Sequence, residues 1–195
     1  MNKLKTEKIE EDYADNNFLI TAMGRYTDQK GFDNLIKAVK NVIEKGYEIK
    51  LIIMGKGENK QQLNALIKKL NLKDKVELIG FKSNPYKYIS ESDLFVLSSN
   101  YEGFPNSLLE AMACEVPVIS TDCPTGPSEI IDNNKNGILV PVGDVNKLTE
   151  EIIHIYNDST FANKIASVAK NTIVSNYNID KIMEEYSNLF LEMRN

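Results

Sequence analysis

Six short apolar segments, separated by stretches with helical periodicity, constrain the fold of this chain more than any other feature. The segments span residues 18–24, 49–55, 76–80, 93–99, 117–121 and 137–141. Between residues 32 and 43, apolar side chains recur at the three- and four-residue spacing of a helix. Strands that are apolar throughout are typical of a parallel sheet covered on both faces. We therefore predict an α/β, doubly wound, Rossmann-like domain with a six-stranded parallel sheet in the order 3-2-1-4-5-6.

The two ends of the chain differ from this central pattern. Residues 1–16 are polar and 8 of them are charged, so we interpret them as a linker or tail. Residues 17–195 are predicted to form a single domain, with extra C-terminal helices from Asp144 onward. The last helix has an apolar stripe formed by Ile179, Ile182, Met183, Tyr186, Leu189 and Phe190.

Composition and charge exclude several classes of function. The formal net charge of −5 disfavours non-specific binding of nucleic acid or of an anionic membrane surface. No apolar run approaches the ~20 residues of a membrane span, and the N-terminus lacks the apolar core of a signal peptide. The only cysteines are Cys114 and Cys123, which fits a cytosolic protein whose thiols are reduced better than a disulfide scaffold. We expect a cytoplasmic domain without direct membrane contact, although the whole protein could be peripheral on the inner membrane face.

Two loops with unusual residues follow the first and fourth predicted strands, after Gly24 and after Ser99. In a doubly wound sheet, ligands bind beyond the carboxyl ends of the strands, where the strand order reverses. In the predicted order, that point lies between the first and fourth strands. These two loops are therefore expected to face one another and to form a ligand site.

The first loop carries two cations. Arg25 and Lys30 bracket a turn between Gly24 and Gly31, near which a helix is predicted to begin. A helix N-terminus offers unpaired N–H groups, and an arginine and a lysine add charge, so this loop suits a phosphate. The alternative is a solvated basic pair on the surface.

The second loop leads into a short apolar helix. Pro105 is predicted at the first helical position, which would leave the N–H groups of Asn106 and Ser107 free for a ligand. Gly103 allows a close approach to the backbone. This loop is therefore a second candidate contact for the same ligand.

Glu110 stands among apolar neighbours in that helix. A buried carboxylate needs hydrogen-bond donors, which the hydroxyls of a ribose would supply. The alternative is a structural ion pair, for which Arg25 is a candidate partner. Glu102, just before the helix, could accept hydrogen bonds from a sugar, or could serve only as a favourable charge near the helix N-terminus.

These motifs together resemble a known family. The segment from Glu102 to Ala113 resembles the E-x7-E segment of retaining GT-B glycosyltransferases, the bacterial group 1 enzymes and their relatives such as sucrose synthase. The loop 24–31 is similar to the phosphate-binding loop of that family. Further matches follow in order at 117–119, 126–130 and 136–140. The resemblance covers residues 17–190.

The resemblance implies a role for each site residue. Arg25, Lys30 and Glu102 would be the catalytic groups, with the two cations on the diphosphate and Glu102 on the donor sugar. Glu110 would bind the ribose. Other expected contacts to the donor are Gly24, Gly80, Phe81, Gly103, Phe104, Asn106, Ser107 and Leu108, with Gly80 and Phe81 lining the base pocket.

The resemblance also implies the reaction. The donor would be a nucleoside-diphosphate sugar, expected to be UDP-linked, bound without a metal or another cofactor. The acceptor would be a glycan or a lipid-linked molecule, held by an N-terminal domain that this sequence lacks, so this piece alone is expected to be inactive. The stretch Cys123–Pro127 favours bacterial surface polysaccharide synthesis. The alternatives are a non-catalytic donor-binding subunit that needs a separate acceptor-binding chain, and a GT-B-fold epimerase or phosphorylase.

Three remaining signals have simpler interpretations. Gly55-Lys56-Gly57 follows the second strand and lacks the third glycine of a dinucleotide fingerprint, so a tight turn is the preferred interpretation. His154, the only histidine, is expected to be structural or exposed. No spacing of potential ligands indicates a metal site, and no serine or cysteine has the partners of a nucleophilic triad.

Overall fold

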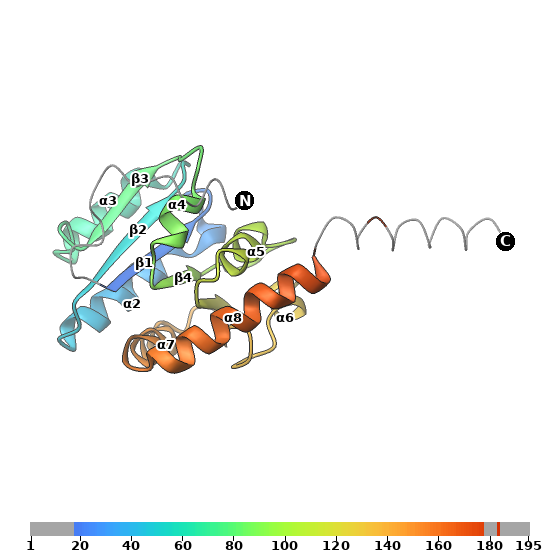
Figure 1. The fold of residues 1–195 in the computed structure, drawn as a ribbon. Helices are drawn as coiled ribbons and strands as arrows, with labels where there is room; N and C mark the ends of the chain where they lie inside the picture. Colours follow the sequence, from blue (N-terminus) through green and yellow to red (C-terminus); the bar gives the residue numbers. More distant parts are fainter. Residues whose placement is uncertain (1–17, 178–182, 184–195) are drawn as a thin grey trace.

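The computed structural model describes residues 18–177 and 183, and these residues alternate strand and helix as predicted (Figure 1). The elements are β1 (Phe18–Met23), η1 (Asp28–Lys30), α2 (Phe32–Glu44), β2 (Ile49–Met54), α3 (Lys60–Lys69), β3 (Val76–Gly80), α4 (Tyr86–Ser90), β4 (Leu94–Leu97), α5 (Asn106–Ala113), β5 (Val118–Thr121), α6 (Pro127–Ile130), β6 (Ile138–Val140), α7 (Val145–Asn157) and α8 (Ser159–Asn176). The predicted tail at 1–16 and the stripe of the last helix, apart from Met183, lie outside the described residues.

The six strands form one parallel sheet in the order β3-β2-β1-β4-β5-β6, which confirms the predicted topology. β1 pairs with β2 along its whole length, from Phe18 opposite Ile49 to Met23 opposite Met54. On its other side β1 pairs with β4. The strand order therefore reverses between β1 and β4, and the loops that follow these two strands leave the sheet side by side.

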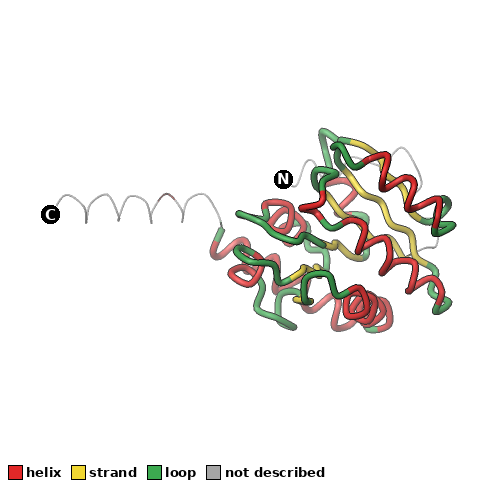
Figure 2. Tube along the Cα trace, turned by 180° about the vertical axis from the view of Figure 1, so that it is seen from behind, coloured by secondary structure: helices red, strands yellow, loops and turns green. Residues whose placement is uncertain are grey.

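Helices cover both faces of the sheet, as the view from behind also shows (Figure 2). One apolar cluster joins the sheet to α2, α3 and α7, and it includes Leu35, Ile67 and Ile152. A second cluster joins the opposite face to α4, α5 and α8, and it includes Ile89 and Met112. Because both faces are covered, the central strands are mostly apolar, and β4 and β5 are buried throughout, including the polar Ser120 and Thr121 of β5.

The strands that lead into the site are shorter than predicted, because their last residues bond to the loops. β4 ends at Leu97, and the hydroxyl of Ser98 then donates to the carbonyl oxygen of Lys30 at 2.8 Å. α2 begins at Phe32, directly after Gly31, as expected. Gly31 adopts a left-handed conformation with φ of 56°, and a Cβ there would lie 2.2 Å from the carbonyl oxygen of Ser98. Only glycine fits between these two loops.

Candidate functional site

The loop after β1 and the loop after β4 are bonded to each other, which confirms that they face one another. The N–H of Asn100 donates to the carbonyl oxygen of Gln29 at 2.7 Å, and the Gln29 amide donates to the carbonyl oxygen of Tyr101 at 3.0 Å. The side-chain amide of Asn100 also donates to the carbonyl oxygen of Asp28 at 2.6 Å. Arg25 and Lys30 therefore belong to a loop whose backbone is held in place along its second half.

Lys30 and Glu102 form an ion pair where the two loops meet. Lys30 Nζ lies 2.6 Å from Glu102 Oε1, and the hydroxyl of Ser99 donates to the same oxygen at 2.6 Å. The two charged side chains are only 15% and 6% exposed. The aliphatic part of Lys30 lies against Gly24, where a Cβ would come within 2.8 Å of Lys30 Cε. The structure thus brings together the two residues that were assigned to the diphosphate and to the sugar.

A cavity of about 430 Å³ opens beside this pair, at the carboxyl ends of β1, β2 and β3. Its volume lies within the range of small-molecule sites. Four residues predicted from the sequence, namely Gly24, Arg25, Phe81 and Glu110, line it together. The full lining is Met23, Gly24, Arg25, Met54, Gly55, Lys56, Phe81, Lys82, Ser83, Pro85 and Glu110. We call it the donor cavity below, after the role that the sequence resemblance predicts for its residues.

Cations outnumber carboxylates in the donor cavity. Arg25, Lys56 and Lys82 line it against the single carboxylate of Glu110, which gives a formal local charge of 3 − 1 = +2. The whole chain has a net charge of −5, so this surface is opposite in sign to the rest of the molecule. A concave cationic surface concentrates anions, and it is suited to a diphosphate.

Phe81 offers the cavity an exposed aromatic ring. Its side chain is 69% exposed, and Lys56 Nζ lies 5.6 Å from the ring centroid. Gly80, the last residue of β3, has a φ of 75° and positions this ring at the end of the strand. An exposed ring beside a cationic cavity is a surface on which a planar base can stack.

Glu110 is half-buried on α5 and faces the donor cavity. The hydroxyl of Tyr86 lies 3.4 Å from Glu110 Oε1. Burial raises the pKa of the Glu110 carboxyl, and the hydrogen bond from Tyr86 offsets part of this increase. Among the residues that the structure describes, Arg25 and Glu110 do not form the alternative ion pair, although they line the same cavity. The carboxylate is therefore available for hydroxyl donors of a ligand.

The turn after β2 contributes more to the site than its sequence indicated. A Cβ on Gly55 would lie 1.8 Å from the carbonyl oxygen of Gly24, and a Cβ on Gly57 would lie 2.5 Å from that of Tyr26. Both glycines let this turn pack directly on the loop that carries Arg25. The interpretation of Gly55-Lys56-Gly57 as a turn agrees with the structure, but only packing brings Lys56 to the donor cavity.

Tyr26 is a second supporting residue that the sequence did not reveal. It is completely buried, and its hydroxyl donates to the carbonyl oxygen of Ile53 at 3.0 Å and accepts from the N–H of Gly80 at 3.3 Å. Burial raises the pKa of this phenol, which keeps it protonated and able to donate. Tyr26 thus connects the loop after β1 with β2 and with the end of β3.

The loop before α5 departs from expectation in three details. Pro105 precedes the helix as its N-cap, and α5 begins at Asn106. The sequence predicted a free N–H at Asn106, but this N–H donates to the carbonyl oxygen of Phe104 at 3.0 Å. Leu108 is fully buried in the core, and its N–H donates to the carbonyl oxygen of Pro105 at 2.9 Å. The predicted contacts through Gly103, Phe104 and Ser107 stay predictions.

His154, the only histidine of the chain, lies away from this site. His154 accepts or donates a hydrogen bond with Glu151 at 3.2 Å and stacks on Phe161, on the outside of α7. In residues 18–177 and 183, no three histidine, cysteine or acidic side chains gather as a possible metal site. No helix of the same residues is long and apolar enough to cross a membrane.

The fold and the site define a class of domain: a doubly wound α/β domain with a cationic cavity at the switch point of its sheet, the arrangement of nucleotide-binding domains. Comparison with known proteins then identifies the family. Residues 5–172 match the family described as glycosyl transferases group 1, and the chain belongs to that family. It corresponds to the C-terminal domain of a GT-B-type member, as the sequence predicted.

Individual relatives agree with this assignment. An uncharacterised glycosyltransferase of Methanocaldococcus jannaschii is 46% identical over 134 residues, which are 67% of this chain and 33% of that protein. A poly(ribitol-phosphate) alpha-N-acetylglucosaminyltransferase of Staphylococcus aureus is 32% identical over 172 residues, or 88% of this chain and 35% of that protein. The chain therefore spans about a third of the length of these relatives.

A solved structure shows the same arrangement in three dimensions. The crystal structure of a mutant of Staphylococcus aureus TarM in complex with fondaparinux, alpha-GlcNAc-glycerol and UDP has a TM-score of 0.85 to this chain at 30% identity. The match covers 95% of this chain and 37% of that chain.

Proposed function

We propose that this chain is the donor-binding domain of a glycosyltransferase that transfers a sugar from a nucleoside-diphosphate sugar, UDP-linked, to a glycan or lipid-linked acceptor. The observation that carries the proposal is the donor cavity, in which Arg25, Phe81 and Glu110 meet beside the Lys30–Glu102 pair. These groups differ in chemistry, and each matches one part of such a donor. The family match supports the same assignment.

The donor is proposed to lie along the cavity in a single orientation. The base stacks on Phe81, the ribose hydroxyls donate to the carboxylate of Glu110, and the diphosphate lies against Arg25. The sugar then reaches the Lys30–Glu102 pair, where Lys30 contacts the phosphate and Glu102 accepts from sugar hydroxyls. Lys56 and Lys82 add positive charge to the same cavity, so the proposal needs no metal ion to neutralise the diphosphate.

In the proposed reaction, the bond between the anomeric carbon and the phosphate oxygen breaks, an acceptor hydroxyl forms the new bond to that carbon, and its proton passes to the departing phosphate oxygen. The sugar gains positive charge, and the departing nucleoside diphosphate gains negative charge. Arg25 and Lys30, held by the loop contacts described above, stabilise that developing negative charge without having to reorganise. Retention at the anomeric carbon is part of the proposal because the E-x7-E segment from Glu102 to Glu110 resembles that of retaining enzymes.

The preference for UDP is supported by the TarM structure, whose complex contains UDP. A thermal-shift comparison of UDP, GDP and ADP, and of their glucose conjugates, tests it on this chain. UDP at a hundred times its Kd should raise Tm by about 5–10 °C, because a ligand that binds only the folded state stabilises it. A larger Tm shift with GDP or ADP would mean that guanosine or adenosine, and not uridine, is the nucleoside of the donor. No Tm shift with any of these nucleotides would refute donor binding.

The acceptor is proposed to be a bacterial surface polysaccharide or its lipid-linked precursor, made in the cytoplasm. The support is the Staphylococcus aureus relative, whose name gives poly(ribitol-phosphate) as its acceptor. A longer protein that contains this domain and an acceptor-binding domain should transfer labelled sugar to such an acceptor. Recovery of an isomerised nucleotide sugar, or of a sugar phosphate, would instead indicate an epimerase or a phosphorylase.

A further inference from the structure

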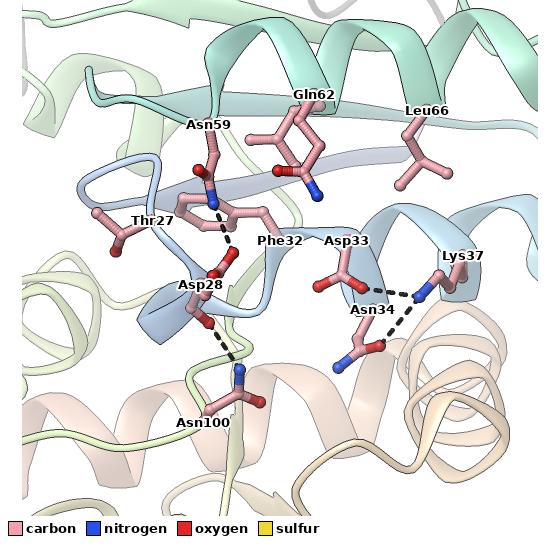
Figure 3. A pocket seen from close by; sticks show the side chains of 11 residues that line it. Thr27, Asp28, Phe32, Asp33, Asn34, Lys37, Asn59, Gln62, Leu66 and Asn100 are labelled. Carbon is pink, nitrogen blue, oxygen red and sulfur yellow. Dashed lines mark hydrogen bonds and ion pairs between the residues drawn. The ribbon is translucent and has the colours of Figure 1, made fainter.

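A second cavity lies between the first turns of α2 and α3, beside Thr27 and Asp28 of the loop after β1 (Figure 3). It has a volume of about 440 Å³ and shares no lining residue with the donor cavity. Its lining consists of Thr27, Asp28, Phe32, Asp33, Asn34, Lys37, Asn59, Gln62, Leu63, Leu66 and Asn100. We call it the amide pocket, because side-chain carboxamides dominate its polar lining.

Four carboxamides from three segments converge on the amide pocket. They belong to Asn34 on α2, Asn59 and Gln62 at the start of α3, and Asn100 after β4. Each carboxamide can donate and accept at once, which matches a hydroxyl group that also does both. Phe32 and the leucines of α3 supply the apolar part of the lining. Polar groups that bond in both directions around an apolar surface suit a sugar ring.

Part of this lining is already fixed without a ligand. Asn59 donates to Asp28 Oδ1 at 2.6 Å, and Asn100 donates to the carbonyl oxygen of Asp28 at 2.6 Å (Figure 3). Each of these two carboxamides uses its NH₂ group and keeps its oxygen as an acceptor. Within the described part of the chain, the Gln62 amide makes no hydrogen bond to protein, so both its groups are open. A ligand would meet a largely preformed set of acceptors and donors.

The charge of the amide pocket distinguishes its ligand from the nucleotide. Asp28 and Asp33 line it with Lys37, which gives a formal charge of 1 − 2 = −1. Lys37 is also held by Asp33 at 2.7 Å and lies 3.5 Å from Asn34 Oδ1. The donor cavity, with a formal charge of +2, has the opposite sign. A phosphate would be repelled from the amide pocket, whereas an uncharged, hydroxyl-rich ligand would not.

The amide pocket is lined by the same two loops that carry the Lys30–Glu102 pair, where the sugar is proposed to be transferred. Asp28 stands two residues before Lys30, and Asn100 stands two residues before Glu102. Asp28 and Asn100, which are bonded to each other, therefore each stand close along the chain to one member of the Lys30–Glu102 pair. A chain of sugars whose end lies near that pair could extend into the pocket.

We propose that the amide pocket binds an uncharged sugar unit of the acceptor glycan. The inference rests on the proposed function, because an acceptor glycan is expected only of a glycosyltransferase. It also narrows that function, since a subsite with this charge favours a neutral glycan over a phosphate-linked polymer at this position.

The test uses the isotope-labelled 195-residue chain and follows side-chain amide resonances by nuclear magnetic resonance. The probes are the methyl glycosides of glucose, galactose and N-acetylglucosamine at millimolar concentrations, with inorganic phosphate as the anionic comparison. At least one glycoside should shift the amide signals of Asn34, Asn59 and Gln62, and phosphate should not. No shift with any glycoside, or an equal shift with phosphate, would overturn the proposal.

Variants of the lining residues test whether the glycosides bind in the amide pocket. Gln62→Ala and Asn34→Ala should each weaken glycoside binding by about two- to tenfold, the effect of losing one or two hydrogen bonds. Gln61→Ala, which removes the exposed neighbouring carboxamide outside the pocket, should have no effect. Unchanged glycoside affinity in the Asn34→Ala, Gln62→Ala double variant would place the sugar elsewhere and overturn the proposal.

UDP titrated into the same samples separates this inference from the proposed function. UDP should bind the wild type and both pocket variants equally, because neither residue lines the donor cavity. UDP binding without glycoside binding would overturn only the proposal that the amide pocket binds a sugar, and donor binding would stand. Failure of UDP to bind would refute the proposed function whatever the glycosides do.

Discussion

Lys30 and Glu102 lie 72 positions apart in the chain, yet Lys30 Nζ is 2.6 Å from Glu102 Oε1. The pair joins the loop after β1 to the loop after β4 across the point where the strand order reverses. Both side chains are almost buried, so each depends on the other for its charge partner. The pair therefore contributes to stability before any ligand is present.

Removal of Lys30 should destabilise the domain. In Lys30→Ala, the nearly buried carboxylate of Glu102 keeps only the hydroxyl of Ser99 as a partner, which should cost about 1–3 kcal/mol in the free energy of unfolding. Urea denaturation measures the change. The control is Lys135→Ala, which removes an exposed ion pair with Asp132 and should change the free energy by less than about 0.5 kcal/mol. Equal effects of the two substitutions would show that burial of the pair is unimportant.

Loss of the Tyr26 hydroxyl should loosen the support of the loop that carries Arg25. Tyr26→Phe keeps the buried ring but leaves the carbonyl oxygen of Ile53 and the N–H of Gly80 without this partner. The expected loss is about 1–2 kcal/mol in the free energy of unfolding. Tyr101→Phe, at a side chain that is 58% exposed, is the matched control and should be near neutral. A neutral Tyr26→Phe would contradict the bridging role.

Gly55 should not accept a side chain. Gly55→Ala adds a Cβ only 1.8 Å from the carbonyl oxygen of Gly24, at a φ of 151°, so the turn after β2 must move away from the site. Denaturation should show a loss of about 2–4 kcal/mol. Gly46→Ala is the control that separates backbone strain from steric clash. Gly46 also has a positive φ, of 91°, but no atom lies within 4 Å of its Cβ position. A loss in Gly55→Ala no greater than in Gly46→Ala would refute the close packing.

Glu110 should make stability depend on pH. Burial raises the pKa of its carboxyl in the folded state, so the folded state favours the protonated form. This contribution to stability is complete below the ordinary pKa of 4.5 and is lost as the pH rises through the raised pKa. Relative to Glu110→Gln, the wild type should therefore become less stable over that range in urea denaturation at a series of pH values.

Tyr86 provides a check on the cause of that pH dependence. Its hydrogen bond lowers the pKa of Glu110, so Tyr86→Phe should move the range of pH dependence upward. A free-energy difference between wild type and Glu110→Gln that stays constant with pH would contradict the burial of this carboxyl.

Much of the fold followed from the alternation of apolar strands and amphipathic helices. Because both faces of the sheet are covered, the strands are mostly apolar, and the sequence shows them plainly. The strand ends were predicted less well. Ser98 and Ser99 continue the fourth segment in sequence but leave the strand, because their hydroxyls bond to Lys30 and Glu102. Such a boundary depends on a contact between distant segments, which a local pattern does not contain.

The site was predicted in part for the same reason. Arg25 and Glu110 were found because each is unusual in its own segment, and the topology placed their loops together. Lys56 and Lys82 are ordinary surface lysines in sequence, and only packing brings them to the donor cavity. Tyr26 resembles any loop tyrosine until its burial is seen. Gly55 and Gly57 indicated a tight turn in the sequence, but not that this turn packs on the backbone of Gly24 and Tyr26.

The most direct test of this account is calorimetric titration of UDP into the wild type and into Arg25→Ala. Arg25 lines the donor cavity and is assigned to the diphosphate, so its removal should weaken UDP binding by about tenfold or more. Lys69→Ala, an exposed cation on α3 outside the cavity, should bind UDP as the wild type does. Undiminished affinity in Arg25→Ala would contradict the assignment of this loop to the diphosphate.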